Sequence, residues 1–192
     1  MNSGARRASA VGGVVIAASV IGWLLFIGLP RWYGTPKKAG PAVPATAPAP
    51  GGKKIKARLY YVGPDGTRLT AVERDVAYGE GTIQQATEII TAQIAPAPEG
   101  LVSAVPVGTS LRALFLDDQS RAYVDLSEPV SSAHSGGTLD EILTVYTIVD
   151  ALTSNLPAIK AVQILVDGKE VDTLAGHVDL RQPLARDLSW VQ

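Results

Sequence analysis

The chain has 192 residues, of which 46% are hydrophobic and 18% are charged, and its formal net charge is −1. This length allows one membrane segment and one domain of ordinary size, and it excludes two large domains. Because the sequence has no cysteine, it excludes disulfides, cysteine-ligated metal sites, a cysteine nucleophile and a lipid-modified cysteine.

The charge is unevenly distributed along the chain. Residues 1–50 contain five Lys or Arg and no acidic residue, so residues 51–192 carry a net charge of −6. Proteins that bind nucleic acid neutralise its phosphates with basic surfaces. We therefore expect no nucleic-acid partner for the acidic part of the chain.

A hydrophobic segment without charges lies near the N-terminus and predicts a transmembrane helix over residues 10–30, after a short tail of residues 1–9. About 20 apolar residues at a rise of about 1.5 Å span a hydrocarbon core of about 30 Å. The nearest Ala-x-Ala-like cleavage site lies far downstream, so we predict that the segment is retained as a signal-anchor. Basic residues flank both ends, so charge alone does not decide the orientation.

Residues 31–54 are predicted to form a linker. The segment is rich in Pro and Ala and has no apolar period after its first residues, so it cannot bury enough surface to fold. Its proline-rich part, residues 35–52, favours the extended polyproline II conformation at about 3.1 Å per residue, so these roughly 18 residues would hold a domain up to about 50 Å from the bilayer.

The remaining residues, 55–192, show the patterns of one folded domain. Apolar and alternating runs between turn residues predict strands, and two stretches with a helical period predict helices. Thr82 with Gln85, and Thr138 with Glu141, match the capping-box pattern at the two helix starts. The predicted strands cover 55–62, 69–77, 110–116, 121–126, 161–166 and 169–174, and the predicted helices cover 82–95 and 138–154.

The element order ββαββαββ predicts the α+β class. We expect a two-layer α/β sandwich, in which a mixed or antiparallel sheet carries both helices on one face. In the first helix, Ile83, Ala86, Ile90 and Ile94 recur on one side and should face the core. We also expect most aromatic residues of the domain to occupy core positions. These aromatics are Tyr60, Tyr61, Tyr78, Phe115, Tyr123, Tyr146 and Trp190.

The two histidines of the chain offer little for catalysis or metal binding. His134 could act with Ser132 or Ser135 and with Asp140, but no Gly-x-Ser-x-Gly elbow accompanies it, and we interpret it as a solvated loop residue. A metal site at His177 and Asp179 would need further ligands that the sequence does not place nearby.

The acidic residues are better explained by turns and caps. Asp117 and Asp118 lie at one predicted hairpin tip, and Asp167 precedes Gly168 at another.

A third acidic group, Asp125 with Ser127 and Glu128, follows a strand and could hold a cation or catalyse hydrolysis, but we favour side chains that bind the local backbone. We therefore expect no catalytic residue, no cofactor and no metal.

An ordered series of short motifs resembles the GerMN domain of spore-germination and sporulation proteins, which also occurs in many bacterial envelope proteins. The segment 94–100 departs from the family pattern, and the chain has one such domain where some sporulation members have two. The motifs are Leu59–Tyr61, Leu69–Arg74, Val105–Thr109, Ala122–Ser127, Thr147–Thr153 and Val162–Gly168.

The resemblance implies a compact, non-catalytic domain outside the cytoplasmic membrane, related in fold to modules that build rings in envelope assemblies. The resemblance thereby decides how the chain crosses the membrane: the N-terminal tail is expected in the cytoplasm and the domain outside it. The expected function is an interaction or assembly module of the cell envelope, bound to an envelope protein or to peptidoglycan. Two alternatives remain open: an envelope hydrolase that uses Asp125, Glu128 or His134, and a homo-oligomer that forms rings or filaments through exposed strand edges.

Overall fold

A computed structural model describes residues 52–192. The predicted cytoplasmic tail, the predicted membrane span at 10–30 and most of the predicted linker lie outside these residues. Within the described part, no helix is both long enough and apolar enough to cross a membrane.

The strands and helices confirm the α+β class, and most bounds agree with the prediction to within one residue. The last predicted strand is shorter than expected, and the short elements α4, β7 and η2 were not predicted. The elements are β1 (Lys54–Val62), β2 (Leu69–Ala77), α3 (Gly81–Ile94), β3 (Leu111–Leu116), β4 (Arg121–Leu126), α4 (Pro129–Ser132), α5 (Thr138–Asn155), β5 (Ala161–Val166), β6 (Lys169–Glu170), β7 (Leu184–Ala185) and the 3₁₀ turn η2 (Leu188–Trp190).

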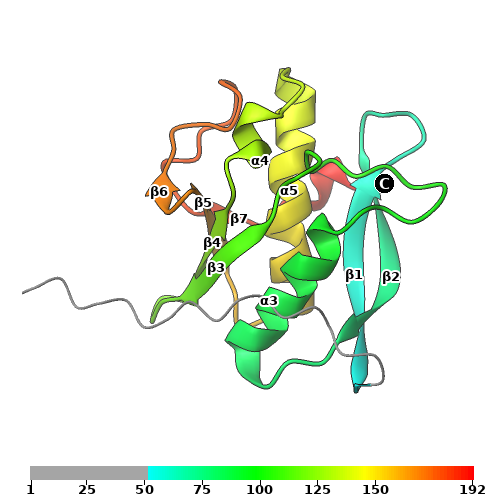
Figure 1. The fold of residues 1–192 in the computed structure, drawn as a ribbon, viewed down its shortest axis with the longest axis vertical. Helices are drawn as coiled ribbons and strands as arrows, with labels where there is room; N and C mark the ends of the chain where they lie inside the picture. Colours follow the sequence, from blue (N-terminus) through cyan, green and yellow to red (C-terminus); the bar gives the residue numbers. More distant parts are fainter. Residues whose placement is uncertain (1–51) are drawn as a thin grey trace, which may run out of the picture. The chain divides into compact units, whose positions relative to one another are not determined.

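The strands form two sheets, which corrects the expectation of a single sheet, whereas both helices do lie on one face of the larger sheet. One sheet is the antiparallel hairpin β1–β2, and the other has the order β3-β4-β5-β6, with β7 also paired to β5. The second sheet is mixed, because β4 and β5 are parallel while the other pairs are antiparallel. Helices α3 and α5 lie between the two sheets and contact both of them (Figure 1).

The division into two sheets has a local cause at the free edge of β1. The side-chain amide of Asn155 accepts a hydrogen bond from the Arg58 N–H (2.8 Å) and donates one to the Arg58 carbonyl (2.7 Å). Two residues further along, Gln93 does the same for the N–H (2.8 Å) and the carbonyl (2.7 Å) of Tyr60. The amides of α3 and α5 thus occupy the positions where another strand would pair with β1.

The start of α3 differs from the predicted capping box. The helix begins at Gly81 without a side-chain cap, and Gln85 is buried instead. Its side chain accepts from the Gly79 N–H (3.0 Å) and donates to the Ala77 carbonyl (3.1 Å), which fixes the connection from β2. Because the buried side of α3 includes Gln85 and Gln93, the helix is rotated from the predicted face and Ile83 is 49% exposed.

The start of α5 also lacks the predicted capping box. Gly137 precedes the helix, and the side chain of Glu141 turns inward and has no exposed surface. Its Oε1 accepts the N–H groups of Leu174 (2.7 Å) and Ala175 (3.0 Å), and its Oε2 accepts that of His177 (2.8 Å). Burial alone would raise the pKa of Glu141, but these backbone hydrogen bonds outweigh it and hold the pKa below its ordinary value. Glu141 therefore anchors the loop after β6.

The C-terminal segment, residues 184–192, connects the two sheets across α5. It starts as β7 on β5, and the ring of Trp190 then stacks on Tyr146 of α5 with 6.5 Å between centroids. At its end the Gln192 N–H donates to the carbonyl of Leu69 in β2 (2.9 Å).

Asp150 lies under this segment and has no exposed surface. Its Oδ1 accepts the Asp187 N–H (3.1 Å), whereas the buried Oδ2 has no hydrogen-bond partner among the described residues. Burial raises the pKa of Asp150 to about 7. The carboxyl group is thus poorly solvated in its charged form at the point where the C-terminal segment meets α5.

We predict that Gln93→Leu lowers the free energy of unfolding by about 3 kcal/mol, because it leaves the buried N–H and carbonyl of Tyr60 without partners. Urea denaturation measures the loss. Gln84→Leu in the same helix is the matched control, since the Gln84 side chain binds an exposed N–H of Glu80. Equal losses of unfolding free energy in the two variants would show that the amide pairing at β1 contributes no more to stability than an exposed hydrogen bond.

We predict that the domain becomes less stable as the pH rises from 5 to 8. The pKa of Asp150 is about 7 in the folded state and ordinary in the unfolded state, so the folded state holds the proton more tightly and stability is lost as that proton leaves. The free energy of unfolding should fall by about 3 kcal/mol over this range, and Asp150→Asn should remove the fall.

Asp179→Asn is the control for this titration, because Arg181 lowers the pKa of Asp179 to about 2. Its stability between pH 5 and 8 should follow that of the wild type. If the free energy of unfolding of Asp150→Asn still falls between pH 5 and 8, another group is responsible for the titration.

Candidate interaction surface

The outer face of the five-stranded sheet points away from both helices. Strand alternation places Leu114, Val124 and Ile164 on the inner face, where they are buried, and places their neighbours Phe115 and Tyr123 on the outer face. No helix of the described part covers this outer face (Figure 1). At β5 the loop after β6 covers this face, because Gln163, the partner of Tyr123, is buried and its side-chain amide donates to the carbonyl of Leu180. The open part of the outer face therefore lies at β3 and β4.

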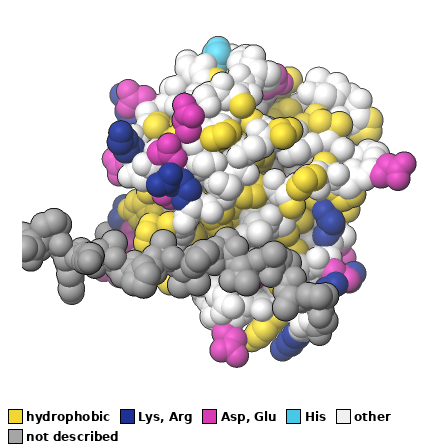
Figure 2. Space-filling model, in the orientation of Figure 1, with side chains coloured by type: hydrophobic (Ala, Val, Ile, Leu, Met, Phe, Trp, Pro, Cys, Tyr) yellow, Lys and Arg dark blue, Asp and Glu magenta, His cyan; other side chains and the backbone are white. Residues whose placement is uncertain are grey.

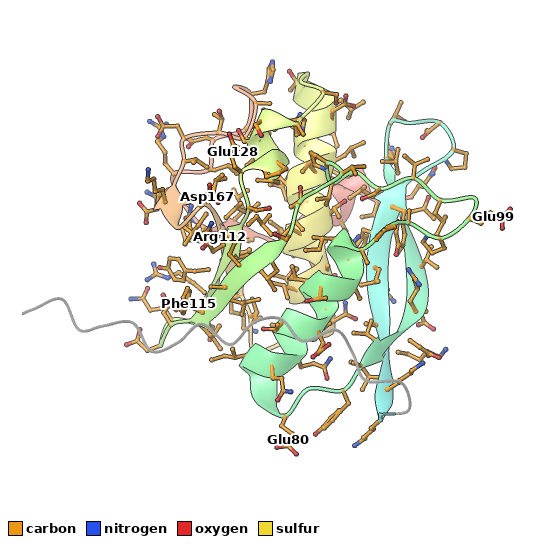
Figure 3. All side chains as sticks on the ribbon, in the orientation of Figure 1. Glu80, Glu99, Arg112, Phe115, Glu128 and Asp167 are labelled. Atoms are coloured by element: carbon orange, nitrogen blue, oxygen red, sulfur yellow. The ribbon has the colours of Figure 1, made fainter. Side chains whose placement is uncertain are left out.

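Phe115 is the main apolar group on this face. It is 57% exposed, lies directly opposite Tyr123 in the register of β3 and β4, and points outward from the sheet (Figure 3). The expectation that most aromatic residues of the domain occupy core positions is therefore wrong: of the seven, only Tyr60 and Tyr61 are buried, and Tyr78, at 42%, is exposed like Phe115. Phe115 and Tyr123 thus form an aromatic pair at the surface.

An ionic cluster borders the aromatic pair on one side. A β-bulge at the start of β3 sets Arg112 beside Asp125 (Nε to Oδ2, 3.2 Å) and Asp167 (Nη1 to Oδ1, 2.7 Å). Arg112 lies between Asp167 and Phe115 along this side of the molecule (Figure 3). In the space-filling view, hydrophobic atoms gather next to a group of acidic and basic side chains there (Figure 2).

A second ion pair borders the aromatic pair on the other side. Arg121 Nε lies 2.6 Å from Asp117 Oδ2 at the tip of the β3–β4 hairpin. Burial opposes ionisation of Asp117, but hydrogen bonds from the backbone and side chain of Arg121 prevail, so the pKa of Asp117 is lowered. We call Arg112, Phe115, Asp117, Arg121 and Tyr123 the outer-face patch. Its apolar centre and charged rim have the composition of a protein interface.

Asp125 and Ser127 bind backbone N–H groups of segments that are distant in the chain, whereas Glu128 precedes α4 without a side-chain cap. Asp125 is buried, and its Oδ1 accepts the Gly168 N–H (2.7 Å) while its Oδ2 receives Arg112. The Ser127 hydroxyl accepts the Ser110 N–H (2.9 Å), and Glu128 lies at the start of α4. Asp125 is thus fully engaged in fixing the β5–β6 turn.

The candidate catalytic histidine is held by structural hydrogen bonds. Nδ1 of His134 accepts the Gly136 N–H (3.0 Å), so Nε2 carries the proton and donates to the Thr144 hydroxyl (3.1 Å). Ser135 and Asp140 bind each other (3.1 Å), and the Ser132 hydroxyl donates to the Glu128 carbonyl (3.2 Å). The structure does not bring His134 into hydrogen-bond contact with either serine.

The two residues of the candidate metal pair are engaged separately. His177 Nδ1 lies 3.2 Å from Oε2 of Glu141, whereas Asp179 forms a two-point ion pair with Arg181. In residues 52–192, no three His, Asp or Glu side chains form a group that could hold a metal ion. The inward role of Glu141 is hidden in the sequence, because its spacing from Thr138 matches a capping box.

The family of the chain follows from comparison with known proteins. Residues 58–172 match the family described as Germane, sporulation and spore germination. The chain belongs to this family. It carries one copy of the GerMN domain, as the sequence motifs predicted. No curated protein matches the chain.

Solved structures share the fold of this domain. A protein from Clostridium perfringens described as a lipoprotein has 25% identity and a TM-score of 0.51, over 74% of this chain and 94% of that one. The tandem GerMN domains of the Bacillus subtilis sporulation protein GerM have 17% identity and a TM-score of 0.54, over 69% of this chain and 46% of that one. The separate structure of the first GerM domain has 16% identity and a TM-score of 0.50, over 69% of this chain and 98% of that one.

Proposed function

We propose that this protein is a single-pass membrane protein whose GerMN domain lies outside the cytoplasmic membrane and acts as a non-catalytic interaction or assembly module of the bacterial cell envelope. In this proposal residues 1–9 are cytoplasmic, residues 10–30 span the membrane, and residues 31–54 form the linker. The partner is an envelope protein or peptidoglycan, bound through the outer-face patch.

The outer-face patch carries the proposal. Aromatic and arginine side chains dominate the binding energy of protein interfaces, and an apolar centre with a polar rim is their usual arrangement. Phe115 is 57% exposed beside ion pairs that fix Arg112 and Arg121 in place. Side chains held in one conformation lose less entropy on binding, so a partner can bind the patch at a lower entropic cost.

The location is supported by the sequence and by the relatives. The charge-free segment at 10–30 has the length of a membrane span. The description of the family names sporulation and spore germination, and the similar protein from Clostridium perfringens is described as a lipoprotein. Both descriptions fit a domain that works at the envelope.

We predict that alkaline phosphatase fused after Gln192 is active in cells, because this enzyme folds only outside the cytoplasm. The control is the same fusion to a variant in which Ile21 and Leu25 are replaced by Arg, which should abolish insertion of the predicted span. An inactive fusion to the wild-type chain at normal protein levels would contradict the proposed orientation.

We predict that a photoreactive phenylalanine derivative at position 115 crosslinks to one envelope component in living cells. The matched control carries the same group at Val107, which is 95% exposed and lies in the loop before β3. Digestion of the product with a protease or with a muramidase distinguishes a protein partner from peptidoglycan. Addition of Tyr123→Ala should weaken the crosslink, because it removes the aromatic neighbour.

Equal products from positions 115 and 107 would contradict the assignment of the outer-face patch. So would a crosslink that stays unchanged with Tyr123→Ala.

A further inference from the structure

A partly open cavity of about 310 Å³ lies at the end of α5 and shares no lining residue with the outer-face patch. Three segments line it: the last turns of α5, the connection to β5, and the residues of β7 and just after it. Its volume is at the lower end of the range for ligand sites, which suits a small molecule or the end of a longer one. The lining residues are Thr153, Ser154, Pro157, Ile159, Lys160, Ala185 and Arg186.

Hydrogen bonds hold the wall of this cavity in place. The Tyr60 hydroxyl donates to the Ser154 hydroxyl (2.8 Å), and the Lys160 N–H donates to the carbonyl of Ser120 (2.8 Å). Ala185 pairs with Ala161 in the sheet. The backbone around the cavity is therefore fixed by β1, β4 and β5 before any ligand arrives.

The polar groups of the lining are mainly hydrogen-bond donors. Lys160 and Arg186 are its two charged residues, and neither forms an ion pair within residues 52–192. The Ser154 oxygen accepts from Tyr60, so its own proton is available for an acceptor. Two cationic residues, Lys160 and Arg186, and the hydroxyl residue Ser154 therefore border one cavity in a domain whose net charge is negative.

Two acidic groups, Asp150 and Asp187, lie near Arg186. Burial raises the pKa of Asp150, and the charge of Arg186 partly opposes that rise. One oxygen of Asp187 accepts the Ser189 N–H (3.0 Å), and one oxygen of Asp150 accepts the Asp187 N–H (3.1 Å). The C-terminal end of α5 adds a weak negative potential, so an anion would depend on the two cationic side chains rather than on the helix.

We propose that this cavity binds an oxyanion, a carboxylate or a phosphate group, through the guanidinium of Arg186, the ammonium of Lys160 and the hydroxyl of Ser154. Guanidinium groups match the two oxygens of such anions with parallel hydrogen bonds, and lysine adds a point charge. The shared chemistry covers the free carboxylate of a peptide and the phosphate of a lipid headgroup or polymer. The site is independent of the outer-face patch.

The test uses the purified full chain in a non-ionic detergent, labelled with ¹⁵N, and two probes. One probe is inorganic phosphate, and the other is N-acetyl-alanyl-alanine, which carries one free carboxylate. We expect amide signals of residues 153–160 and 185–186 to shift and saturate at millimolar concentration with at least one probe. Saturation by phosphate alone, or by the peptide alone, identifies which oxyanion the site prefers.

The variant that removes both charges is Lys160→Gln with Arg186→Gln. Both side chains are exposed, so a folded spectrum is expected, and the dissociation constant should rise at least tenfold. Lys169→Gln is the control, because Lys169 is an exposed cation on β6 outside the cavity, and its dissociation constant should stay within twofold of the wild type. The proposal is overturned if neither probe saturates, or if the double variant binds as tightly as the wild type.

Discussion

The arrangement of the whole domain depends on how the free edge of β1 is closed. Two side-chain amides, one from each long helix, pair with the backbone of Arg58 and Tyr60 as a neighbouring strand would. This pairing ties both helices to the hairpin and leaves no room for a third strand at that edge. The remaining strands must therefore form their own sheet on the other side of the helices. As a result, the far face of that second sheet is left without a helical cover.

The long helix α5 is the second organising element, and it works through buried polar side chains. Glu141 holds the loop after β6, Thr144 donates to the carbonyl of Ala104 (2.6 Å), and Asn155 closes the edge of β1. Each of these contacts specifies one position of a distant segment, which apolar packing alone would define less sharply. Asp150 is the exception, because one of its oxygens is buried without a partner among the described residues. Such a group costs stability when it is charged.

Local patterns predicted the strands and helices well, since strand alternation and helical period are properties of neighbouring residues. Gln85 and Glu141 have the spacing of a capping box, but each binds other backbone groups. Gln85 binds the connection just before α3, and Glu141 binds a segment 33 residues further along the chain. β7 has two residues and no alternation, so only its pairing with β5 defines it.

The outer-face patch and the cavity at the end of α5 also depend on contacts between segments that are distant in the chain. Asp125 does bind a backbone N–H, but that N–H belongs to Gly168, 43 residues further along the chain, so its partner depends on the tertiary fold. The exposure of Phe115 depends on which face of the second sheet the helices cover, which the alternation of β3 does not reveal. The cavity at the end of α5 combines residues from three separate segments, and no motif in the sequence connects Ser154 and Lys160 with Arg186.

The closure of β1 also has a consequence for the order in which the domain is completed. Asn155 lies 97 residues after Arg58, and Gln93 lies 33 residues after Tyr60. A growing chain therefore produces the hairpin long before it produces the helix that protects the hairpin's edge. Until α5 has been made, that edge is an unpaired strand that other chains can bind. The free edge of β1 is thus among the last parts of the domain to be protected from pairing with other chains.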